Sequence, residues 1–217
     1  MTEYTLYSYY RSSCSWRVRL ALELKNLPYK LIQINLLDND QNSGNYLEIN
    51  PAGVVPALVL KNGTILTQSV AIMEYLEEIN SILPLLPADP IQRAQVRQLV
   101  QLISADCQPL QNLHVLRKIR TLANLQSDDE ARTIWGRPFI LKALQAYTKL
   151  LSKSMGVFSV GDSVSMADCC LIPQLYNARR FGINVETEFP LLAQIEANFR
   201  SFHAEAFSKA HPDNSQS

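Results

Sequence analysis

The sequence predicts an α/β domain followed by an all-helical domain. Strand and helix patterns alternate over the first 35 residues, and an Asn-Gly turn then separates two further β-rich runs. From Ile91 onward there is no convincing strand pattern, only helical ones. These observations divide the 217 residues into predicted domains over 1–82 and 90–217, with a linker at 81–90 that contains three prolines.

The chain opens with an extended run, Tyr4 to Tyr9, that gives way to a polar turn. On one face of the helix pattern that follows, Arg19 and Glu23 have the i, i+4 spacing of an ion pair. On another face, apolar residues recur at i, i+4 and i+8, as Trp16, Leu20 and Leu24. The pattern therefore predicts a strand followed by a helix.

This helix is expected to stop at Asn26-Leu27-Pro28, because proline disfavours the helical conformation of the residue before it. Tyr29 to Asn35 then forms a short β-rich run. Strand, helix and strand over about 30 residues make a βαβ unit, whose two strands are parallel with a right-handed crossover.

Two more β-rich runs, Gly53 to Leu60 and Thr64 to Leu66, flank Asn62-Gly63, which is the strongest short hairpin signal. Pro56 has no N–H for a ladder, so we place it at the start of its strand. Ser69 then opens a helix pattern as its expected cap. A βαβ unit followed by ββα is the thioredoxin-like arrangement.

The second half shows four helical patterns, over roughly 91–117, 129–152, 165–179 and 188–206. Pro109 is expected to kink or end the first of them. Ser165 and Asp168 have capping-box spacing, in which the hydroxyl and the acidic residue satisfy each other's backbone donors. We therefore assign Asp168 a structural role.

The charges balance, with 20 basic and 20 acidic residues. Such a chain has no bulk attraction to nucleic acid or to anionic lipid, so an anionic ligand must be held by local groups. The N-terminus lacks the pattern of a signal peptide, and no apolar stretch is long enough to span a membrane. We expect a soluble, cytoplasmic protein without a nucleic-acid or membrane partner.

The four cysteines show no pair with the two-residue gap of zinc or dithiol motifs, so we expect no metal site. Cys169 and Cys170 lie in an apolar helix pattern, where a small buried hydrophobe is the default interpretation. Cys14 alone lies in a polar turn that could hold a thiolate.

That turn, Arg11 to Ser15, precedes the first helix. Serine oxygens accept hydrogen bonds from the first-turn N–H groups of a helix, and the same groups with the helix dipole can hold an anion. The turn is therefore suited to a thiolate, phosphate or carboxylate. Taken alone, it also fits an ordinary serine-rich cap with one buried cysteine.

The whole string Ser12-Ser13-Cys14-Ser15-Trp16-Arg17-Val18-Arg19, followed by an apolar helix, resembles the signature of the zeta class of glutathione transferases. The resemblance extends from Tyr7 to about Phe199, although segment 118–150 is generic. It implies maleylacetoacetate isomerase activity in tyrosine and phenylalanine catabolism, glutathione as cofactor, a cis bond before Pro56 and a homodimer.

The resemblance also implies which residues bind glutathione. His114 departs from the pattern, since it stands where the class has a small hydroxyl residue. The contacts expected from the first domain are Ser12, Ser13, Cys14, Ser15, Trp16, Gln41, Val55, Gln68 and Ser69, and those from the second are Gln108, Asn112, Leu113 and His114.

The chemistry favours Ser12 as the donor to the sulfur. Holding a thiol of pKa ~8.5 as its thiolate at neutral pH needs about 2.7 kcal/mol. A helix N-terminus supplies ~0.3–1 kcal/mol and a hydrogen bond to a charged acceptor ~1.5–3. A serine hydroxyl at the helix start combines both, so we predict that Ser12 is catalytic, with Ser13 and Cys14 in support.

In the implied reaction, the thiolate adds to the cis double bond of a diacid, the adduct rotates and the thiolate leaves. Arginine is the best carboxylate clamp because its donors form a planar fork. Arg11 and Arg180 are therefore the predicted substrate-binding residues, whereas Arg179 is expected to be a solvated surface charge.

Three alternatives stay open. The first is a maleylpyruvate isomerase or a general glutathione transferase. Thiol transfer through Cys14 is the second, although Ser12 rather than a cysteine holds the position expected for the sulfur contact. A non-catalytic scaffold is the third, but a scaffold needs none of Ser12, Gln68, Ser69 and Arg180.

Overall fold

The computed structural model describes residues 3–214, in which the chain forms two compact units. The first unit contains the residues up to Leu85 together with the segment from His203, and the second contains Leu86–Phe202. Across residues 3–214, every helix is too short or too polar to cross a membrane.

A four-stranded sheet forms the centre of the first unit. Its strands are β1 (Tyr4–Ser8), β2 (Tyr29–Gln33), β3 (Ala57–Val59) and β4 (Ile65–Thr67), in the order β2-β1-β3-β4. β1 and β2 are parallel, whereas β3 is antiparallel to both β1 and β4. The predicted βαβ unit and the predicted hairpin are both confirmed, and Pro56 lies just before β3 with the expected cis bond.

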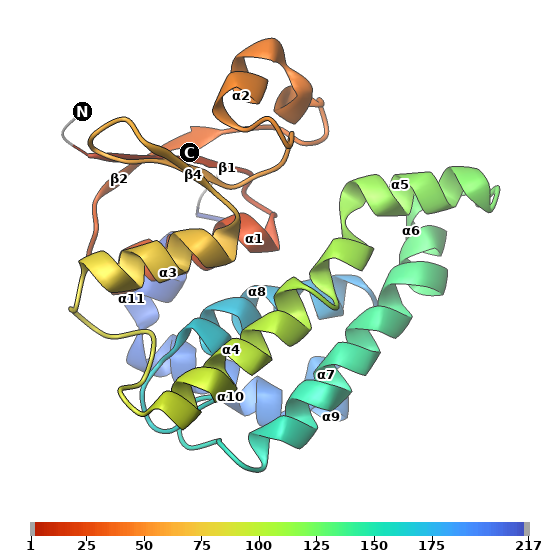
Figure 1. Ribbon diagram of the computed structural model, residues 1–217. Helices are drawn as coiled ribbons and strands as arrows, with labels where there is room; N and C mark the ends of the chain where they lie inside the picture. The colour runs from red at the N-terminus through yellow and green to blue at the C-terminus, as the bar shows by residue number, and fades with distance from the viewer. Residues whose placement is uncertain (1–2, 215–217) are drawn as a thin grey trace. The chain divides into compact units, whose positions relative to one another are not determined.

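Helices cover both faces of this sheet. Figure 1 shows α1 and α3 on one face and α2 on the other. The bounds of the helical elements in this unit are α1 Ser13–Leu24, the 3-10 turn η1 Asp40–Asn42, α2 Gly44–Ile49, α3 Ser69–Ile79 and α11 Ala204–Ala210. Between the sheet and the helices lies an apolar core that includes Leu6, Leu20 and Leu58, each 0% exposed.

The predicted apolar stripe of α1 is buried, and one of its members meets α11. The indole ring of Trp16 is 2% exposed and stands at 61° to the ring of Phe207, with the centroids 6.2 Å apart. The His211 ring, just beyond α11, lies 5.1 Å from the same indole. Residues from the end of the described chain therefore complete the core of the first unit.

The predicted limits 1–82 and 90–217 place α11 in the helical domain, whereas it packs in the first unit with α1. These limits stay a prediction, and their outer ends lie outside the described residues.

Two local predictions are wrong. Arg19 does not pair with Glu23, because its guanidinium is buried and donates to backbone and hydroxyl oxygens instead. Ser69 does not cap α3, because the N-cap position is held by Gln68, whose backbone has a positive φ of 69°.

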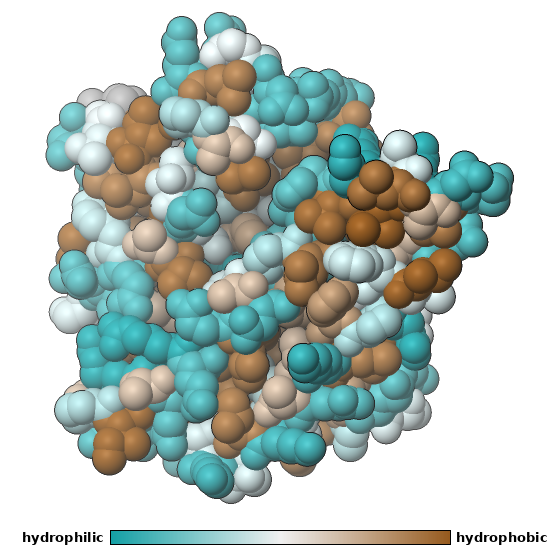
Figure 2. Space-filling model, turned by 45° about the vertical axis from the view of Figure 1, so that its right-hand side comes forward, coloured by the Kyte–Doolittle hydropathy of each residue, from teal (hydrophilic) through white to brown (hydrophobic). Residues whose placement is uncertain are grey.

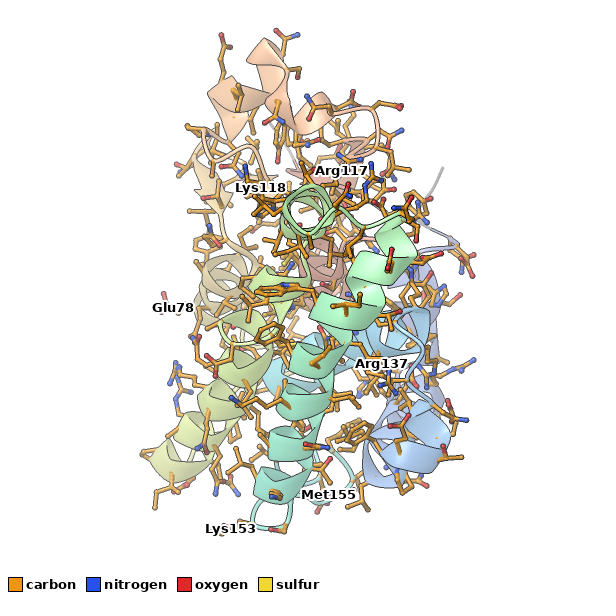
Figure 3. The ribbon with its side chains drawn as sticks, turned by 90° about the vertical axis from the view of Figure 1, so that its right-hand side faces the viewer. Glu78, Arg117, Lys118, Arg137, Lys153 and Met155 are labelled. Carbon is orange, nitrogen blue, oxygen red and sulfur yellow. The ribbon has the colours of Figure 1, made fainter. Side chains whose placement is uncertain are left out.

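The second unit, Leu86–Phe202, is described throughout and contains no strand element. Its helical elements are α4 Pro90–Ser104, the 3-10 turn η2 Gln108–Gln111, α5 Leu113–Leu122, α6 Asp128–Ala131, the π-helical turn η3 Arg132–Gly136, α7 Arg137–Leu151, α8 Met166–Arg180, α9 Val185–Glu188 and α10 Pro190–Phe202. α8 is buried along most of its length and packs on α4, α7 and α10. Figure 3 labels Arg137 at the start of α7 and Lys153 just beyond its end.

The pattern predicted over 91–117 is interrupted in the structure. α4 ends at Ser104, and Pro109 lies inside η2, which separates α4 from α5. The proline lacks an N–H and fits this short turn better than a helix interior. The predicted effect of Pro109 is therefore confirmed.

The predicted capping box at the start of α8 is also confirmed. The N–H and hydroxyl of Ser165 both donate to Asp168 Oδ2 at 2.8 Å, and the Ser159 N–H donates to Oδ1 at 3.0 Å. Burial raises the pKa of the Asp168 carboxyl, and these hydrogen bonds act in the opposite direction. Asp168 thus joins the loop before α8 to the first turn of that helix.

Candidate active site

The polar turn between β1 and α1 has the predicted geometry. Ser12 is the N-cap of α1, and its Oγ accepts a hydrogen bond from the N–H of Ser15 at 3.2 Å. The N–H of Ser12 itself donates to the Tyr9 carbonyl oxygen at 2.9 Å. Because the hydroxyl oxygen serves as the acceptor in its cap bond, its own proton can be donated to an anion above the helix start.

The side chains of this turn alternate in exposure. Ser12 and Cys14 are partly exposed, whereas Ser13 is 6% exposed and Ser15 is fully buried. The Oγ of Ser15 accepts a hydrogen bond from the N–H of Tyr9 at 3.4 Å, so this buried side chain joins the two ends of the turn. Arg11, Ser12 and Cys14 are therefore the members of the turn whose side chains can reach a bound molecule. Ser13, Ser15 and Trp16 are buried, and their contacts with glutathione stay a prediction.

The second expected ligand site lies before β3. The hydroxyl of Tyr46 and the side-chain amide of Asn50 donate to the Val54 carbonyl oxygen at 2.7 and 2.6 Å. Burial raises the pKa of Tyr46 to about 12, so its hydroxyl remains a donor at neutral pH. These two bonds fix the peptide before Val55, the residue predicted to pair with glutathione.

At the start of α3, an arginine from α1 reaches Ser69, one of the predicted glutathione contacts. Arg17 is 1% exposed, and its Nη1 donates to Ser69 Oγ at 3.3 Å. Gln68, beside it, is exposed. A buried positive charge lies beneath the first turn of α3, which adds to the attraction of that helix N-terminus for an anion.

Gln41 lies in η1 and is partly buried. Its Nε2 donates to Asn39 Oδ1 at 3.1 Å. Its Oε1 is buried, and no donor from residues 3–214 bonds to it. Buried polar atoms are normally paired, so this oxygen is an acceptor suited to a ligand N–H group.

Arg11 is held against two tyrosines. Its Nη2 donates to the hydroxyl oxygen of Tyr9 at 3.1 Å, and its Cζ lies 5.0 Å from the ring centroid of Tyr10. Burial raises the pKa of Tyr9, which keeps that hydroxyl neutral. Both contacts restrict the position of the guanidinium next to Ser12.

The remaining predicted glutathione contacts lie in the second unit. Gln108 is the first residue of η2 and is partly exposed, and Asn112 is the N-cap of α5. Leu113 is partly exposed and His114 is exposed. About one turn of α5 further on, Arg117 and Lys118 project from either side of the helix (Figure 3). The contacts of these residues with glutathione stay a prediction.

Arg180 and Arg179 differ in their surroundings. Arg180, the last residue of α8, is exposed; its Nη1 donates to Asn177 Oδ1 at 3.4 Å. Arg179 forms ion pairs with Glu186 at 2.7 Å and with Glu196 at 2.5 Å. Arg179 is thus a structural ion-pair residue rather than the solvated charge that we expected. Arg180 is exposed, and its contact with a substrate stays a prediction.

Sequence reasoning missed the buried arginines of α1 and the pair that holds the Val54 carbonyl. Arg17 and Arg19 lie in an otherwise apolar helix, and this was the signal that they could point inward. No comparable signal marks Tyr46 or Asn50.

Comparison with known proteins agrees with this geometry. Residues 11–79 match the family model of the glutathione S-transferase N-terminal domain, and residues 126–199 match that of the C-terminal domain. A maleylacetoacetate isomerase of Mus musculus is 42% identical over 209 residues, which cover 95% of this chain and 91% of the mouse protein. The chain belongs to the glutathione S-transferase family.

Two solved structures are similar to this chain, and the first of them belongs to the zeta class. A holo maleyl pyruvate isomerase, a bacterial zeta-class glutathione S-transferase, has a TM-score of 0.90 to this chain and 34% identity, with 97% of both chains covered. A maleylacetoacetate isomerase from Anaeromyxobacter dehalogenans carries dicarboxyethyl glutathione and citrate in its active site. Its TM-score to this glutathione S-transferase is 0.84, with 39% identity and 99% and 97% of the chains covered.

Proposed function

We propose that this glutathione S-transferase is a glutathione-dependent cis–trans isomerase that converts maleylacetoacetate to fumarylacetoacetate. The observation that carries the proposal is the Ser12 cap, whose hydroxyl oxygen accepts the Ser15 N–H and leaves its own proton for a thiolate. The relatives named maleylacetoacetate isomerase and the glutathione derivative in the Anaeromyxobacter enzyme support the same reaction.

The first unit fits glutathione by its donor and acceptor set. The buried Oε1 of Gln41 offers an acceptor, and Arg17 beneath Ser69 adds positive charge where a carboxylate would lie. Glutathione carries N–H groups as well as two carboxylates, so it can use both features. The residues that would hold it are Ser12, Cys14, Gln41, Val55, Gln68 and Ser69, together with the main chain from Ser13 to Trp16.

Bound glutathione supplies a thiolate that adds reversibly to the carbon–carbon double bond of the diacid. Ser12 donates a hydrogen bond to the sulfur, and the N-terminus of α1 contributes its dipole. Together they supply about 1.8–4 kcal/mol, which covers the ~2.7 kcal/mol needed to hold the thiolate at neutral pH. Ser12 therefore acts by stabilising the sulfur anion and forms no covalent bond.

Arg11 and Arg180 are proposed to bind the carboxylates of the substrate. Arg11 follows the tyrosines that hold its guanidinium and directly precedes Ser12. Arg180 is exposed at the end of α8 and is steadied by Asn177. A guanidinium can bind each carboxylate through two parallel hydrogen bonds, which orients the diacid as well as attracting it.

Maleylpyruvate is the second proposed substrate. It is the shorter diacid but has the same conjugated cis double bond, so the same thiolate and arginines would serve it. A methylene difference in a site is worth only about 1–3 kcal/mol, which permits turnover of both. We expect maleylacetoacetate to be preferred.

The test is to assay the purified protein with each diacid at sub-stoichiometric glutathione. An isomerase converts many equivalents of substrate for each glutathione, because the cofactor is regenerated. Consumption of glutathione in proportion to product would identify a conjugating transferase instead. Absence of turnover with both diacids would overturn the isomerase proposal.

Thiol transfer is the second candidate function, because Cys14 is a free and partly exposed thiol in the same turn. In this reaction the Cys14 thiolate would attack the glutathione sulfur of a glutathione mixed disulfide and release the other thiol. A second glutathione thiolate would then attack the Cys14–glutathione disulfide, which releases oxidised glutathione and regenerates the Cys14 thiolate. A disulfide-exchange assay with a small glutathione mixed disulfide distinguishes the two functions, since the isomerase reaction does not change the redox state of glutathione.

We further propose a homodimer that works in the cytoplasm. Large apolar side chains are exposed on the first unit, including Ile65 at 37% and Ile79 at 46%. Apolar residues also interrupt the polar surface in the view of Figure 2. The four free cysteines suit a reducing compartment. Sedimentation at micromolar concentration tests the dimer, and a monomer there would contradict it.

A further inference from the structure

Two buried glutamines form a reciprocal pair within the second unit. Gln111, the last residue of η2, is 6% exposed, and Gln174, in α8, is 0% exposed. The Nε2 of Gln111 donates to Oε1 of Gln174 at 2.7 Å, and the Nε2 of Gln174 donates to Oε1 of Gln111 at 3.1 Å. Each carboxamide is donor and acceptor to the other, which fixes the orientation of both.

Packing alone does not require this pair. Two apolar side chains of similar volume would fill the same space without the cost of removing amides from water. A fully satisfied polar pair instead selects one arrangement of the elements that carry it, because any shift leaves buried donors and acceptors unpaired. The pair therefore defines how η2 lies against α8.

The η2 side of the pair belongs to a predicted ligand segment. Gln111 directly precedes Asn112 and is three residues from both Gln108 and His114. The preceding residue is also fixed, because the indole N–H of Trp135 donates to the Leu110 carbonyl oxygen at 3.0 Å. The segment 108–114 is thus held at two successive residues.

Gln174, the α8 member of the pair, lies on the same helix as Arg180, the proposed substrate-binding residue. Gln174 precedes Arg180 by less than two helical turns, a rise of about 9 Å. Asn177, which accepts the hydrogen bond from Arg180, lies between them on the same helix. Because residues 174–180 form one continuous helix, the position of Gln174 also fixes the position of this end of α8.

We propose that Gln111 and Gln174 are positioning residues for the isomerase reaction. They hold segment 108–114 in one register against the helix that carries Arg180. The inference rests on the proposed function, in which Arg180 binds the diacid, and on the predicted contact of this segment with glutathione. Neither glutamine need touch a ligand, since both act through the residues that they place.

The test compares Gln111→Met, Gln174→Met and the double variant. Each single variant leaves one buried amide without its partner, so its unfolding midpoint should fall. The double variant removes both polar groups and should regain much of that stability, because the unpaired amide is gone. Its KM for the diacid should nevertheless stay raised about tenfold or more, because the register of the segment is lost.

The matched control is Tyr147→Phe. The Tyr147 hydroxyl lies 2.9 Å from the Ser159 hydroxyl in another buried polar pair of the same unit. This control should lose stability with no change in KM. A double methionine variant whose KM returned to the wild-type value would overturn the inference and leave the pair a purely structural role.

Hydrogen exchange supplies a readout that needs no catalysis. In the double variant, the amides of residues 108–114 should exchange faster than in the wild-type protein, whereas the control should leave them unchanged. Equal exchange in the double variant and the wild type would also overturn the inference. The wild-type protein could be inactive while residues 108–114 of the double variant still exchange faster. Only the proposed function would then be wrong, because the pair would still hold its segment.

Discussion

The Nε of Arg19 donates a hydrogen bond to the carbonyl oxygen of Ala210 at 2.9 Å, across 191 positions of sequence. The same guanidinium donates to the Ser8 hydroxyl and to the Tyr10 carbonyl oxygen, both at 2.9 Å. Burial lowers the pKa of Arg19 to about 10, which still leaves it charged at neutral pH. One buried cation therefore ties α11 to the turn that carries Ser12.

Replacement of this arginine should destabilise the first unit. Arg19→Met leaves several buried oxygens without a donor, and we expect a loss on the order of 3 kcal/mol in the free energy of unfolding. Arg19→Lys should recover only part of it, because an ammonium cannot reproduce the planar fork. Urea unfolding measures both variants.

Lys30→Met is the control for this comparison, since Lys30 is an exposed cation on β2 of the same unit. It should change the free energy of unfolding by less than about 0.5 kcal/mol. Equal effects of the Lys30 and Arg19 substitutions would show that the hydrogen bonds of Arg19 contribute little to stability.

The thiolate prediction separates Ser12 from Cys14. Ser12→Ala removes the hydroxyl donor and should reduce kcat about a hundredfold, as expected for loss of one donor to an anion. Cys14→Ala should weaken the reaction less, because Ser12 remains. The measurement is isomerisation with saturating glutathione, accompanied by ultraviolet titration of the bound thiol. Complete loss of isomerisation in Cys14→Ala, with disulfide exchange retained in Ser12→Ala, would favour thiol transfer.

The substrate clamp can be tested on neighbouring arginines. Arg180→Met should raise KM for the diacid about tenfold or more, since a hydrogen-bonded charge pair is lost. Glutathione affinity should change little, because the predicted glutathione contacts do not include Arg180. Arg179→Met, which breaks the ion pair with Glu196, should lower stability and leave KM unchanged. Equal weakening of both ligands by Arg180→Met would assign it a structural role.

The capping box predicts a pH dependence of stability. Burial raises the pKa of Asp168 in the folded protein above its unfolded value of about 3.9. The folded state therefore binds the proton first as pH falls, so titration of this group favours folding on acidification. Its contribution decreases as pH rises through the folded pKa.

Asp168→Asn removes this titration. The difference in unfolding free energy between wild type and variant should grow as the pH falls from about 7 to about 4. Urea unfolding followed by circular dichroism at several pH values measures the difference. A difference that shrinks on acidification would mean that the hydrogen bonds from Ser159 and Ser165 outweigh burial.

Structural features that depend on short stretches of sequence could be predicted. The Asn62-Gly63 hairpin and the capping box at Ser165 each depend on neighbours within a few residues, and the βαβ unit lies within about 30 consecutive residues. All three are present. The serine cap at Ser12 belongs to the same group, since its partner Ser15 is three residues away.

Features that depend on distant parts of the chain could not be predicted. The spacing of Arg19 and Glu23 suggested a surface pair, but the acceptors of Arg19 come from β1, the turn and α11. The same holds for the Gln111 and Gln174 pair, whose members are separated by 63 positions. Residue patterns record which face of a helix is apolar, but not which distant oxygen a buried donor will meet.

Helix α11 packs in the first unit although it follows the second unit in sequence. The first unit therefore cannot be completed until the second unit has been synthesised. As the ribosome extends the chain, the strands and the first helix emerge early, yet the carbonyl of Ala210 and the ring of Phe207 follow only after the whole of the second unit. Until then Trp16 and Arg19 lack these partners. During synthesis the first unit therefore lacks these two contacts until Phe207 and Ala210 have been added, and the polar turn gains this support only after the second unit has been made.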